Sequence, residues 1–463
     1  MKKFDFEKVR IGKAVAEGFC LAHAEGKTFF VRHAAPGDLA DIHVYQKKKG
    51  SLFAEITQLH ESGPDRIGPR CEHFGLCGGC KWQHLTYEAQ IANKQNQVKE
   101  NFDRIGHLEY NEMLPILGSQ SIFDYRNRLD FGFSHQRYLL KEEMGKEHPE
   151  GLEGLGFHIP GRFDKILDVK KCHLQGELSN RIRLFTRKKS LELGLPFYDL
   201  KNHKGIMRSL IIRTSTLNEC MVILAFALED DRNLELLASL KAEFPEITSL
   251  LFTINPKKNE TIYDLEIQTY HGKDHMLEQL GDCKFMIGPK SFFQTNSRQA
   301  EVLYQVAKDF AGLEGHELVY DLYTGTGSIA LYVADKARKV VGVEYVEQAI
   351  EDAKKNAALN SIEHVSFYAG NMKEVLNDAF VAKEGKPDVI ITDPPRAGMD
   401  MEVVEMLLKL RAPKVVYVSC NAATQARDLG LMRDHYTIEK VQPVDMFPHT
   451  HHVENVVLLT LKP

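Results

Sequence analysis

The sequence has few cysteines, no excess of positive charge and no long apolar run. Eight cysteines among 463 residues are too few for a scaffold built from disulfides. A formal net charge of −5 excludes a uniformly basic coat for nucleic acid, but not a local basic groove. The longest apolar run, MVILAFAL at 221–228, is too short to span a bilayer.

The N-terminal residues MKKFDFEKVRIG are charged and contain no apolar core of an export signal. We therefore expect a cytoplasmic protein with reduced thiols and no membrane segment. Hydrophobic residues make up 43% of the chain and charged residues 27%, which is typical of a soluble globular protein. At roughly 150 residues per domain, the length indicates about three domains.

The pattern along the chain predicts where these three domains lie. Residues 1–60 contain short β-rich runs broken by Gly and Pro, which predict a small β-barrel. Residues 61–285 begin with three clustered cysteines and a helical pattern from Tyr87 to Ile105, and continue as a mixed α+β region. Residues 286–463 alternate strands and helices, which predicts a parallel sheet with helices on both faces. The strands are expected at 318–323, 340–345, 365–370, 388–395, 415–420 and 454–461.

A glycine-rich turn follows the first of these strands. Gly325 and Gly327 permit a tight turn and a close backbone approach to a ligand at the next helix. Glu344 follows the second strand, seventeen residues after Gly327, where a carboxylate can accept hydrogen bonds from a ribose diol. With Ala330 the motif is GxGxxA, which by itself fits a dinucleotide site equally well.

The motifs further along decide against a dinucleotide. They are FFQTN at 292–296, DLYTGTGSIAL at 321–331, ITDPPRAGM at 391–399, VYVSCN at 416–421 and MFPHTHHVENVVLL at 446–459. With these motifs the chain resembles, over essentially its whole length, the S-adenosylmethionine-dependent RNA uracil-5-methyltransferases, which make 5-methyluridine in ribosomal and transfer RNA. Ala422 stands where the family has Pro, and Asn455 where a Thr is common.

The resemblance implies an α/β fold with a Rossmann-like methyltransferase domain at 286–463. It also implies that S-adenosylmethionine binds between the glycine-rich turn and the neighbouring strand ends. The implied contacts are Gln294, Tyr323, Gly325, Gly327, Ser328, Glu344, Asn371 and Asp393. Only Glu344 follows from position alone, and helix capping or turn formation is the alternative role for Gln294 and Asn371.

Two residues are expected to carry the chemistry. Uracil C5 is a poor nucleophile, but a thiolate adding at C6 generates an enolate whose C5 can attack a sulfonium methyl. Cys420, at a strand end, is the candidate thiolate, although a cysteine there is commonly just a small buried residue. Glu454 matches the family's base, which removes the C5 proton, and Asp393 is expected to orient the base or the uracil. Arg396 holds a phosphate or polarises the pyrimidine, or else forms a structural ion pair.

Two other readings of this region are open. The histidines His449, His451 and His452 suggest a zinc site, but no cysteine lies near them in sequence. A cytosine-5 RNA methyltransferase would use a second cysteine beside its Pro-containing strand-end motif. The Asp-Pro-Pro motif contains no cysteine, which favours uracil.

The clustered cysteines Cys71, Cys77 and Cys80 surround a glycine-rich loop that would let thiolates converge on one metal centre. By resemblance Cys172 is the fourth ligand and the centre is a [4Fe–4S] cluster, with zinc as the physical alternative. With all four cysteines engaged, we expect a structural or RNA-positioning role and no radical chemistry. The remaining three cysteines, Cys20, Cys220 and Cys283, are expected to be ordinary buried residues.

The N-terminal barrel resembles the TRAM domain, an OB-like RNA-binding module found in this family. Basic residues expected to gather on one side are Lys47, Lys48, Lys49, Arg126, Arg128, Arg137, Arg162, Arg181, Arg183, Arg187, Lys188 and Lys189. The target uracil must leave its stack to reach Cys420, so loop or single-stranded RNA is the expected substrate form.

The leading hypothesis is a monomeric uracil-5-methyltransferase that acts on 23S ribosomal RNA. The same reaction on transfer RNA is the alternative within the class. A non-catalytic RNA-binding ribosome-assembly factor is the alternative from another class, and intact Cys420 and Glu454 argue against it.

Overall fold

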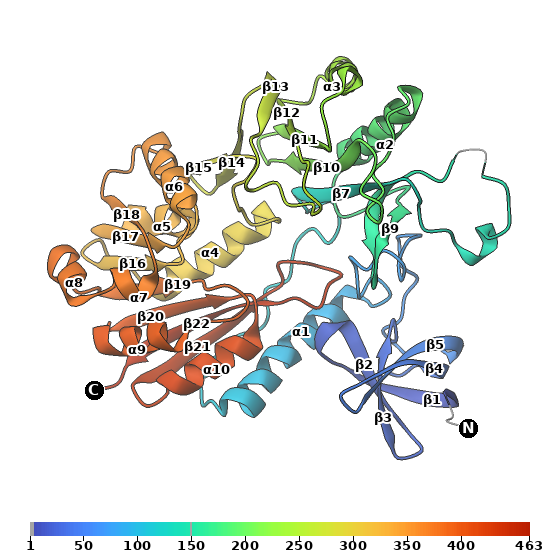
Figure 1. The fold of residues 1–463 in the computed structure, drawn as a ribbon. Helices are drawn as coiled ribbons and strands as arrows, with labels where there is room; N and C mark the ends of the chain where they lie inside the picture. Colours follow the sequence, from blue (N-terminus) through green and yellow to red (C-terminus); the bar gives the residue numbers. More distant parts are fainter. Residues whose placement is uncertain (1–3, 149–150) are drawn as a thin grey trace.

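An N-terminal barrel, a central sheet and a C-terminal sheet make up the computed structural model, which describes residues 4–148 and 151–463 (Figure 1). The barrel is closed in the order β1-β2-β3-β5-β4. Its strands are β1 (Asp5–Ala14), β2 (Phe19–Ala24), β3 (Lys27–Arg32), β4 (Leu39–Lys48) and β5 (Ser51–Glu61). Alternating residues of these strands face the barrel interior, where the rings of Phe6 and Phe29 lie 4.7 Å apart. The predicted small β-barrel is thus confirmed.

A buried ion pair ties the barrel to the segment that follows it. The Asp38 side chain is fully buried and accepts hydrogen bonds from the guanidinium of Arg66 and from the backbone N–H groups of Ala35 and Gly63. These donors hold the pKa of Asp38 below its usual value despite the opposing effect of burial. The chain that leads to the cysteine loop therefore starts from a fixed point.

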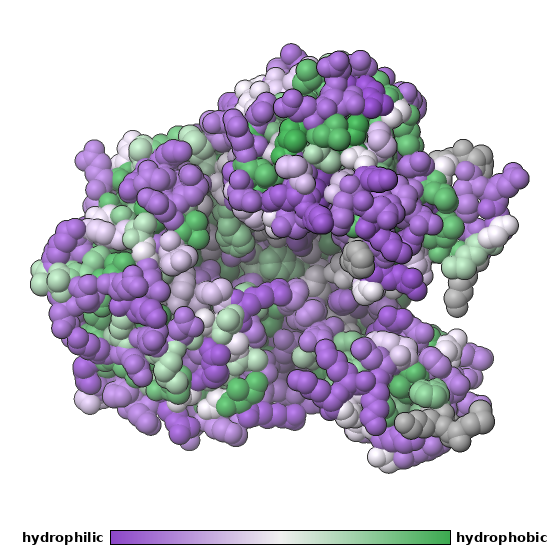
Figure 2. Space-filling model, in the orientation of Figure 1, coloured by the Kyte–Doolittle hydropathy of each residue, from purple (hydrophilic) through white to green (hydrophobic). Residues whose placement is uncertain are grey.

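The central sheet has seven strands in the order β13-β12-β11-β10-β7-β8-β9, and only β11 and β12 pair in parallel. They are β7 (Arg128–Ser134), β8 (Gly154–Ile159), β9 (Arg162–Asp168), β10 (Met207–Thr214), β11 (Cys220–Phe226), β12 (Ser249–Ile254) and β13 (Gln268–Gly272). Helices α2 (Glu177–Glu192) and α3 (Asp231–Glu243) bury apolar side chains in the same core. Figure 2 shows the molecule hollowed between this part and the barrel, with a largely hydrophilic rim.

The C-terminal sheet has eight strands in the order β18-β17-β16-β19-β20-β22-β21-β6. The parallel part comprises β16 (Leu318–Leu322), β17 (Lys339–Glu344), β18 (Val365–Ala369), β19 (Val389–Thr392) and β20 (Lys414–Ser419). The expectation of a parallel sheet holds for these five strands but not for the last strand of the chain. The last strand, β22 (Glu454–Leu461), pairs antiparallel with β20 and with β21 (Tyr436–Val444), a strand not predicted from the sequence. A hairpin connection, with no crossover helix, forces this direction. The two-residue strand β6 (Glu112–Met113) completes the edge.

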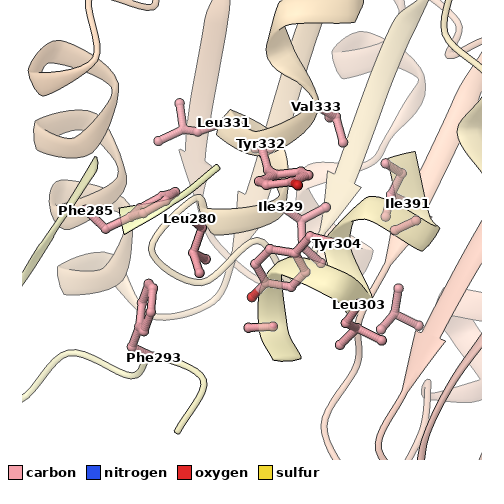
Figure 3. Packing of buried hydrophobic residues seen from close by; sticks show 14 of the residues in the cluster. Leu280, Phe285, Phe293, Leu303, Tyr304, Ile329, Leu331, Tyr332, Val333 and Ile391 are labelled. Atoms are coloured by element: carbon pink, nitrogen blue, oxygen red, sulfur yellow. The ribbon is translucent and has the colours of Figure 1, made fainter. Parts of the chain in front are cut away.

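Helices cover both faces of this sheet. They are α4 (Ser297–Ala311), α5 (Ser328–Val333), α6 (Glu347–Leu359), α7 (Met372–Val375), α8 (Asp378–Glu384), α9 (Met401–Leu410) and α10 (Ala422–Met432). The core on one face includes Tyr304 of α4, Tyr332 of α5 and the hairpin of β14 (Met276–Leu280) and β15 (Cys283–Ile287) (Figure 3). Helix α1 (Tyr87–Asn101) packs beside α10, so a segment near the N-terminus supports the C-terminal sheet. Nowhere in the described parts of the chain does a helix have the length and apolar character that crossing a bilayer requires.

Candidate active site

The glycine-rich turn lies where β16 ends, at the point where the strand order reverses between β17 and β19. Gly327 has φ 79° and caps α5, and a Cβ there would lie 2.9 Å from Phe367 and 3.1 Å from Ala353. Gly325 has φ 55°, but a Cβ there would meet no atom within 4 Å. Gly327 is therefore required by packing, whereas Gly325 borders open space into which a ligand can fit.

Glu344 ends β17 against this turn, as its position predicted. Its two carboxylate oxygens accept hydrogen bonds from the backbone N–H of Gly325, at 3.2 Å, and of Val346, at 3.0 Å. The carboxylate is half-buried, so its oxygens are in reach of a polar ligand that approaches Gly325.

The other predicted contacts lie around the same strand ends. The Ser328 hydroxyl is 3.0 Å from the buried Tyr304 hydroxyl, and Tyr323 has the left-handed φ of 62°. Gln294 precedes α4, and its carbonyl accepts a hydrogen bond from the Asn127 side chain. Asn371 caps α7 by accepting from Lys373 N–H, which is the alternative role that the sequence left open for it.

The pairing of β20 with β22 brings the two predicted reacting residues together. Ser419 is paired with Asn455 in this antiparallel ladder. Cys420 and Glu454 are the next residues along the two strands, so they lie across from one another at the edge where β20 ends. Asn421 then caps α10 by accepting from Ala423 N–H. The partly exposed thiol is thus held between a strand end and a helix start.

Burial and neighbouring charges set the protonation of this site. Burial raises the pKa of the Cys420 thiol to about 11, with the Glu454 and Asp393 carboxylates acting in the same direction and Arg396 against them. Glu454 is only 4% exposed, and burial followed by Asp393 raises its pKa to about 8. Burial and then Asp321 raise the pKa of Asp393 to about 7. The carboxyl groups of Asp393 and Glu454 can therefore gain and lose protons near neutral pH.

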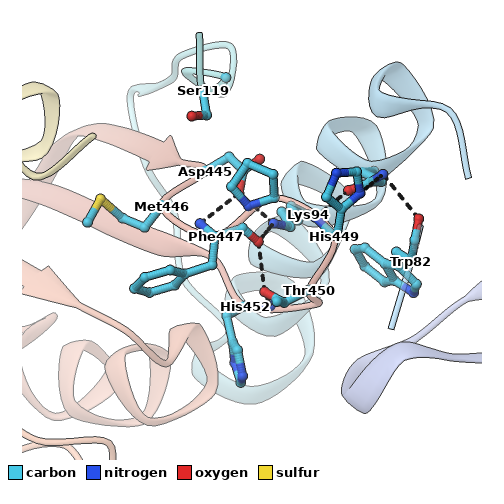
Figure 4. A network of polar contacts seen from close by, with 12 residues as sticks. Trp82, Lys94, Ser119, Asp445, Met446, Phe447, His449, Thr450 and His452 are labelled. Atoms are coloured by element: carbon cyan, nitrogen blue, oxygen red, sulfur yellow. Dashed lines mark hydrogen bonds and ion pairs between the residues drawn. The ribbon is translucent and has the colours of Figure 1, made fainter. Parts of the chain in front are cut away.

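The loop 445–453, between β21 and β22, is fixed by α1 (Figure 4). Lys94 pairs with Asp445, and Gln90 accepts a hydrogen bond from His449 N–H at 2.8 Å. This role was not predictable from the sequence, because Lys94 and Gln90 look like the solvated positions of an amphipathic helix. The burial of a polar helix residue cannot be predicted from its own segment when a loop distant in sequence covers it.

The histidines of this loop do not form a zinc site. The His449 ring packs on Phe123 with a centroid distance of 4.3 Å, and its Nδ1 lies 3.2 Å from the Gln90 amide. Nitrogens of the three rings do not all come within 4.8 Å of one another in the described chain. Burial lowers the pKa of His449, His451 and His452, so these imidazoles are neutral at physiological pH.

The four predicted metal-ligating cysteines line one side of a cavity of about 830 Å³. The Gln83 side chain accepts from Cys71 N–H and donates to the Cys80 sulfur at 3.2 Å. Arg126, Arg128 and Lys171 line the same cavity, as do Arg396 and His452 from the loops beside Cys420. Residues close in sequence to Asp393 and Glu454 thus line the same cavity as the cysteine loop. Arg183, expected on a basic surface, is instead fully buried, with its guanidinium bonded to the carbonyls of Leu155 and Lys170.

Known proteins similar to this chain include RNA methyltransferases. The model of the tRNA (Uracil-5-)-methyltransferase family matches residues 281–462. Two uncharacterised RNA methyltransferases are each 51% identical to this chain. The one from Bacteroides thetaiotaomicron matches over 96% of this chain and 100% of its own length. The one from Porphyromonas gingivalis matches over 97% of this chain and 99% of its own length. The crystal structure of Pyrococcus abyssi tRNA (uracil-54, C5)-methyltransferase in complex with S-adenosyl-L-homocysteine superposes with a TM-score of 0.76 at 29% identity, over 98% of this chain and 99% of that one.

The elevated pKa of Glu454 predicts that this side chain destabilises the fold in a pH-dependent way. Between its ordinary pKa of 4.5 and its folded value of about 8, the folded protein holds a proton that the unfolded chain releases, so stability falls as the pH rises. Glu454→Gln should therefore increase the free energy of unfolding at pH 9 by on the order of 2 kcal/mol, with the gain shrinking toward pH 4.5. Urea unfolding at pH 5, 7 and 9 measures this change in the free energy of unfolding.

The exposed Glu405 of α9 is the control, since Glu405→Gln should change stability little at any pH. An equal effect of Glu454→Gln at all three pH values would contradict the assignment.

Proposed function

This chain belongs to the RNA (uracil-5-)-methyltransferase family, and from that premise we propose that it methylates C5 of a uridine in 23S ribosomal RNA, using S-adenosylmethionine. The main support for this reaction is that Cys420 and Glu454 lie across from one another at the ends of paired strands, beside the glycine-rich turn. In our proposal the barrel at residues 1–60 binds RNA and residues 61–285 hold a metal centre. Residues 286–463 perform catalysis, and the protein acts as a monomer.

Cys420 is the proposed nucleophile. Its sulfur bonds to C6 of the uracil while the thiol proton passes to a neighbouring carboxylate, and the C5=C6 electrons move to C5. C5 then bonds to the methyl group, whose bond to the donor sulfur breaks and leaves its electron pair on that sulfur. The negative charges of Glu454 and Asp393 disfavour the thiolate and Arg396 favours it. The thiolate therefore forms most readily while a neighbouring carboxyl is protonated, and pKa values of about 7 and 8 for Asp393 and Glu454 allow this near neutral pH.

Glu454 is the proposed base for the second half of the reaction. Once C5 carries the methyl group, its remaining proton passes to the Glu454 carboxylate. The electrons of the C5–H bond re-form C5=C6, and the bond between C6 and sulfur breaks, which returns Cys420 as a thiolate. A carboxylate whose pKa is near 8 is a stronger base than an ordinary glutamate. We propose that Asp393 orients this base.

The glycine-rich turn and its surroundings fit S-adenosylmethionine, which supplies the methyl group as a sulfonium. The proposed contacts are Gln294, Tyr323, Gly325, Gly327, Ser328, Glu344, Asn371 and Asp393. The open space beside Gly325 and the half-buried carboxylate of Glu344 suit a ribose with two hydroxyl donors. The relative from Pyrococcus abyssi, which covers almost the whole chain, binds S-adenosyl-L-homocysteine, and this supports the proposal.

We propose that Cys71, Cys77, Cys80 and Cys172 hold a [4Fe–4S] cluster. The donor set fits, since all four thiols line one cavity and the Gln83 amide donates to a sulfur, as is usual around such clusters. Zinc would draw four sulfurs to roughly 3.8 Å from one another, given a Zn–S bond of about 2.3 Å. Within the described chain no three of these sulfurs lie within 4.8 Å of one another, which favours the larger centre. Its proposed role is structural, holding the loop that faces the RNA cavity.

The choice of RNA rests on the cysteines. Cysteine clusters of this kind favour ribosomal RNA by resemblance to family members, whereas the name of the Pyrococcus abyssi relative favours transfer RNA. Transfer RNA is therefore the second candidate substrate. A ribosome-assembly factor without catalysis would not require a thiol and a buried carboxyl at the same strand ends.

The catalytic proposal predicts opposite fates for two variants. Cys420→Ala should lose at least 1,000-fold in methyl transfer, since no adduct can form, whereas Glu454→Gln should transfer methyl but remain bound to the RNA, because elimination stalls. Labelled S-adenosylmethionine, unmodified RNA transcripts and denaturing gels measure both. Cys283→Ala, on β15, is the control and should behave like the parent. Full activity of Cys420→Ala, or no trapped RNA with Glu454→Gln, would disprove the assigned roles.

The metal proposal predicts a brown protein after anaerobic purification, with about four iron atoms per chain. Cys77→Ser should lose iron, and Cys20→Ser, a matched change in the barrel core, should keep it. Metal analysis and the visible absorption spectrum distinguish the outcomes. One zinc and no iron per chain would refute the cluster.

The substrate proposal predicts that cells lacking this protein lose at least one 5-methyluridine from 23S ribosomal RNA, because in the proposal this protein supplies that methyl group. Mass spectrometry of RNA fragments from deleted, parental and Cys420→Ala-complemented cells locates the site. Loss confined to transfer RNA would move the assignment to the second candidate.

A further inference from the structure

A buried ion pair lies beside the proposed base and is not used by the mechanism above. The Lys94 ammonium of α1 lies 2.5 Å from the Asp445 carboxylate, and both side chains are fully buried (Figure 4). Lys94 also donates to the carbonyl of Phe447 at 3.0 Å. The pair therefore joins α1 to the start of the loop 445–453.

Asp445 is held from several sides. Besides Lys94, its carboxylate accepts hydrogen bonds from Phe447 N–H at 3.1 Å and from the Tyr87 hydroxyl at 2.7 Å. One turn before Lys94, the Gln90 side chain accepts a hydrogen bond from the backbone N–H of His449, and its amide nitrogen also bonds to the His449 ring. Helix α1 thus fixes the loop at Asp445, Phe447 and His449, and the loop runs directly into Glu454.

Stability alone does not explain an ion pair at this depth. Removing two charges from water costs about as much as their attraction returns, and apolar replacements of buried pairs are often neutral or stabilising. The position of the pair is more informative. Val444 pairs with Glu454 across β21 and β22, so Asp445 is the next residue along from the one facing the base.

Lys94 is one of two positive charges that counteract the negative groups around Glu454. The groups that act on Glu454 or feel its charge are Asp393 after β19, Arg396, Cys420 after β20, Tyr304 of α4 and Lys94 of α1. Only Arg396 and Lys94 are cationic. Arg396 is exposed, so solvent and salt screen it, whereas Lys94 is fully buried and acts through the protein interior.

We propose that Lys94 is a positioning residue for the proton-abstraction step: it fastens the loop that leads into Glu454 and supplies the buried positive charge that favours the Glu454 carboxylate. The proposal rests on the proposed role of Glu454 as base. Burial lowers the pKa of Lys94, and Asp445 opposes this effect and holds the ammonium in place, so the pair works as a unit. Its charge opposes the repulsion from Asp393, which would otherwise hold the base in its protonated form.

A titration without RNA tests the charge effect independently of catalysis. The side-chain carboxyl carbon of Glu454, labelled with ¹³C and assigned by its loss in Glu454→Gln, is followed by NMR from pH 5 to 10. Lys94→Met should move its midpoint upward by about one pH unit, a tenfold rise in proton affinity, because a neighbouring cation is lost. Lys99→Met, at an exposed lysine of the same helix, should leave the midpoint unchanged. If Lys94→Met does not fold, Lys94→Gln retains amide donors for Asp445 and the Phe447 carbonyl and should give the same direction. An unmoved midpoint in a folded variant would overturn the proposal, even if the enzyme proves active.

The rate of adduct resolution provides the second readout. In single-turnover reactions with an RNA transcript that the parent methylates, Lys94→Met should release methylated RNA about tenfold more slowly at pH 7 and recover toward the parent rate at pH 9 to 10, as the base ionises. A merely structural role would slow release equally at every pH, and that result would also overturn the proposal. Failure of the parent to methylate any RNA would count against the proposed function and leave the NMR result as the test of Lys94.

Discussion

The direction of a single strand determines whether this site can exist. In a parallel sheet the C-terminal end of one strand and the N-terminal end of the next lie at opposite edges, roughly 20 Å or more apart for strands of six to eight residues. Because β22 runs antiparallel to β20, its first residue, Glu454, lies at the same edge as Cys420, which follows the last residue of β20. The parallel strands β16, β17 and β19 bring their own ends to that edge, and with them the glycine-rich turn, Glu344 and Asp393. Cys420, Glu454 and the glycine-rich turn therefore meet through topology and not through proximity in sequence.

Burial gives this edge its chemistry. Asp321, Asp393 and Glu454 all have raised pKa values, with burial as the first cause in each case. Ionising them together inside the protein would be costly, so they share protons near neutral pH. The burial that raises the pKa of Glu454 would make it a stronger base in its proposed role, and it also makes the folded protein less stable at high pH.

The sequence predicted the local elements of this site better than their assembly. Strand–helix alternation, the turn at Gly325 and Gly327 and the acidic end of β17 follow from short-range patterns, and the structure has each of them. The direction of β22 was not predictable, because an isolated apolar strand has the same alternation in either direction, and β21 was missed because it breaks the alternation of strands with helices. The complete burial of Arg183, whose guanidinium bonds the carbonyls of Leu155 and Lys170, also depends on neighbours outside its own helix. The proposed roles of Cys420 and Glu454 rest on motif resemblance, and the structure brings the two residues to the ends of paired strands.

Segments far from the C-terminal sheet in sequence also hold this site in place. The loop 445–453 has no regular structure of its own, so other elements must fix it. Helix α1 provides Gln90 and Lys94, and the backbone N–H groups of Lys81 and Trp82, directly after Cys80, both donate to the carbonyl of His449. The region from the cysteine loop through α1 therefore holds the loop that leads into Glu454. A change that loosens the cysteine loop reaches Glu454 through two hydrogen bonds and one loop, without any contact with the reacting atoms. This explains physically why the central segment and the catalytic sheet belong to one working unit although some 350 residues separate Lys94 from Asp445 in sequence.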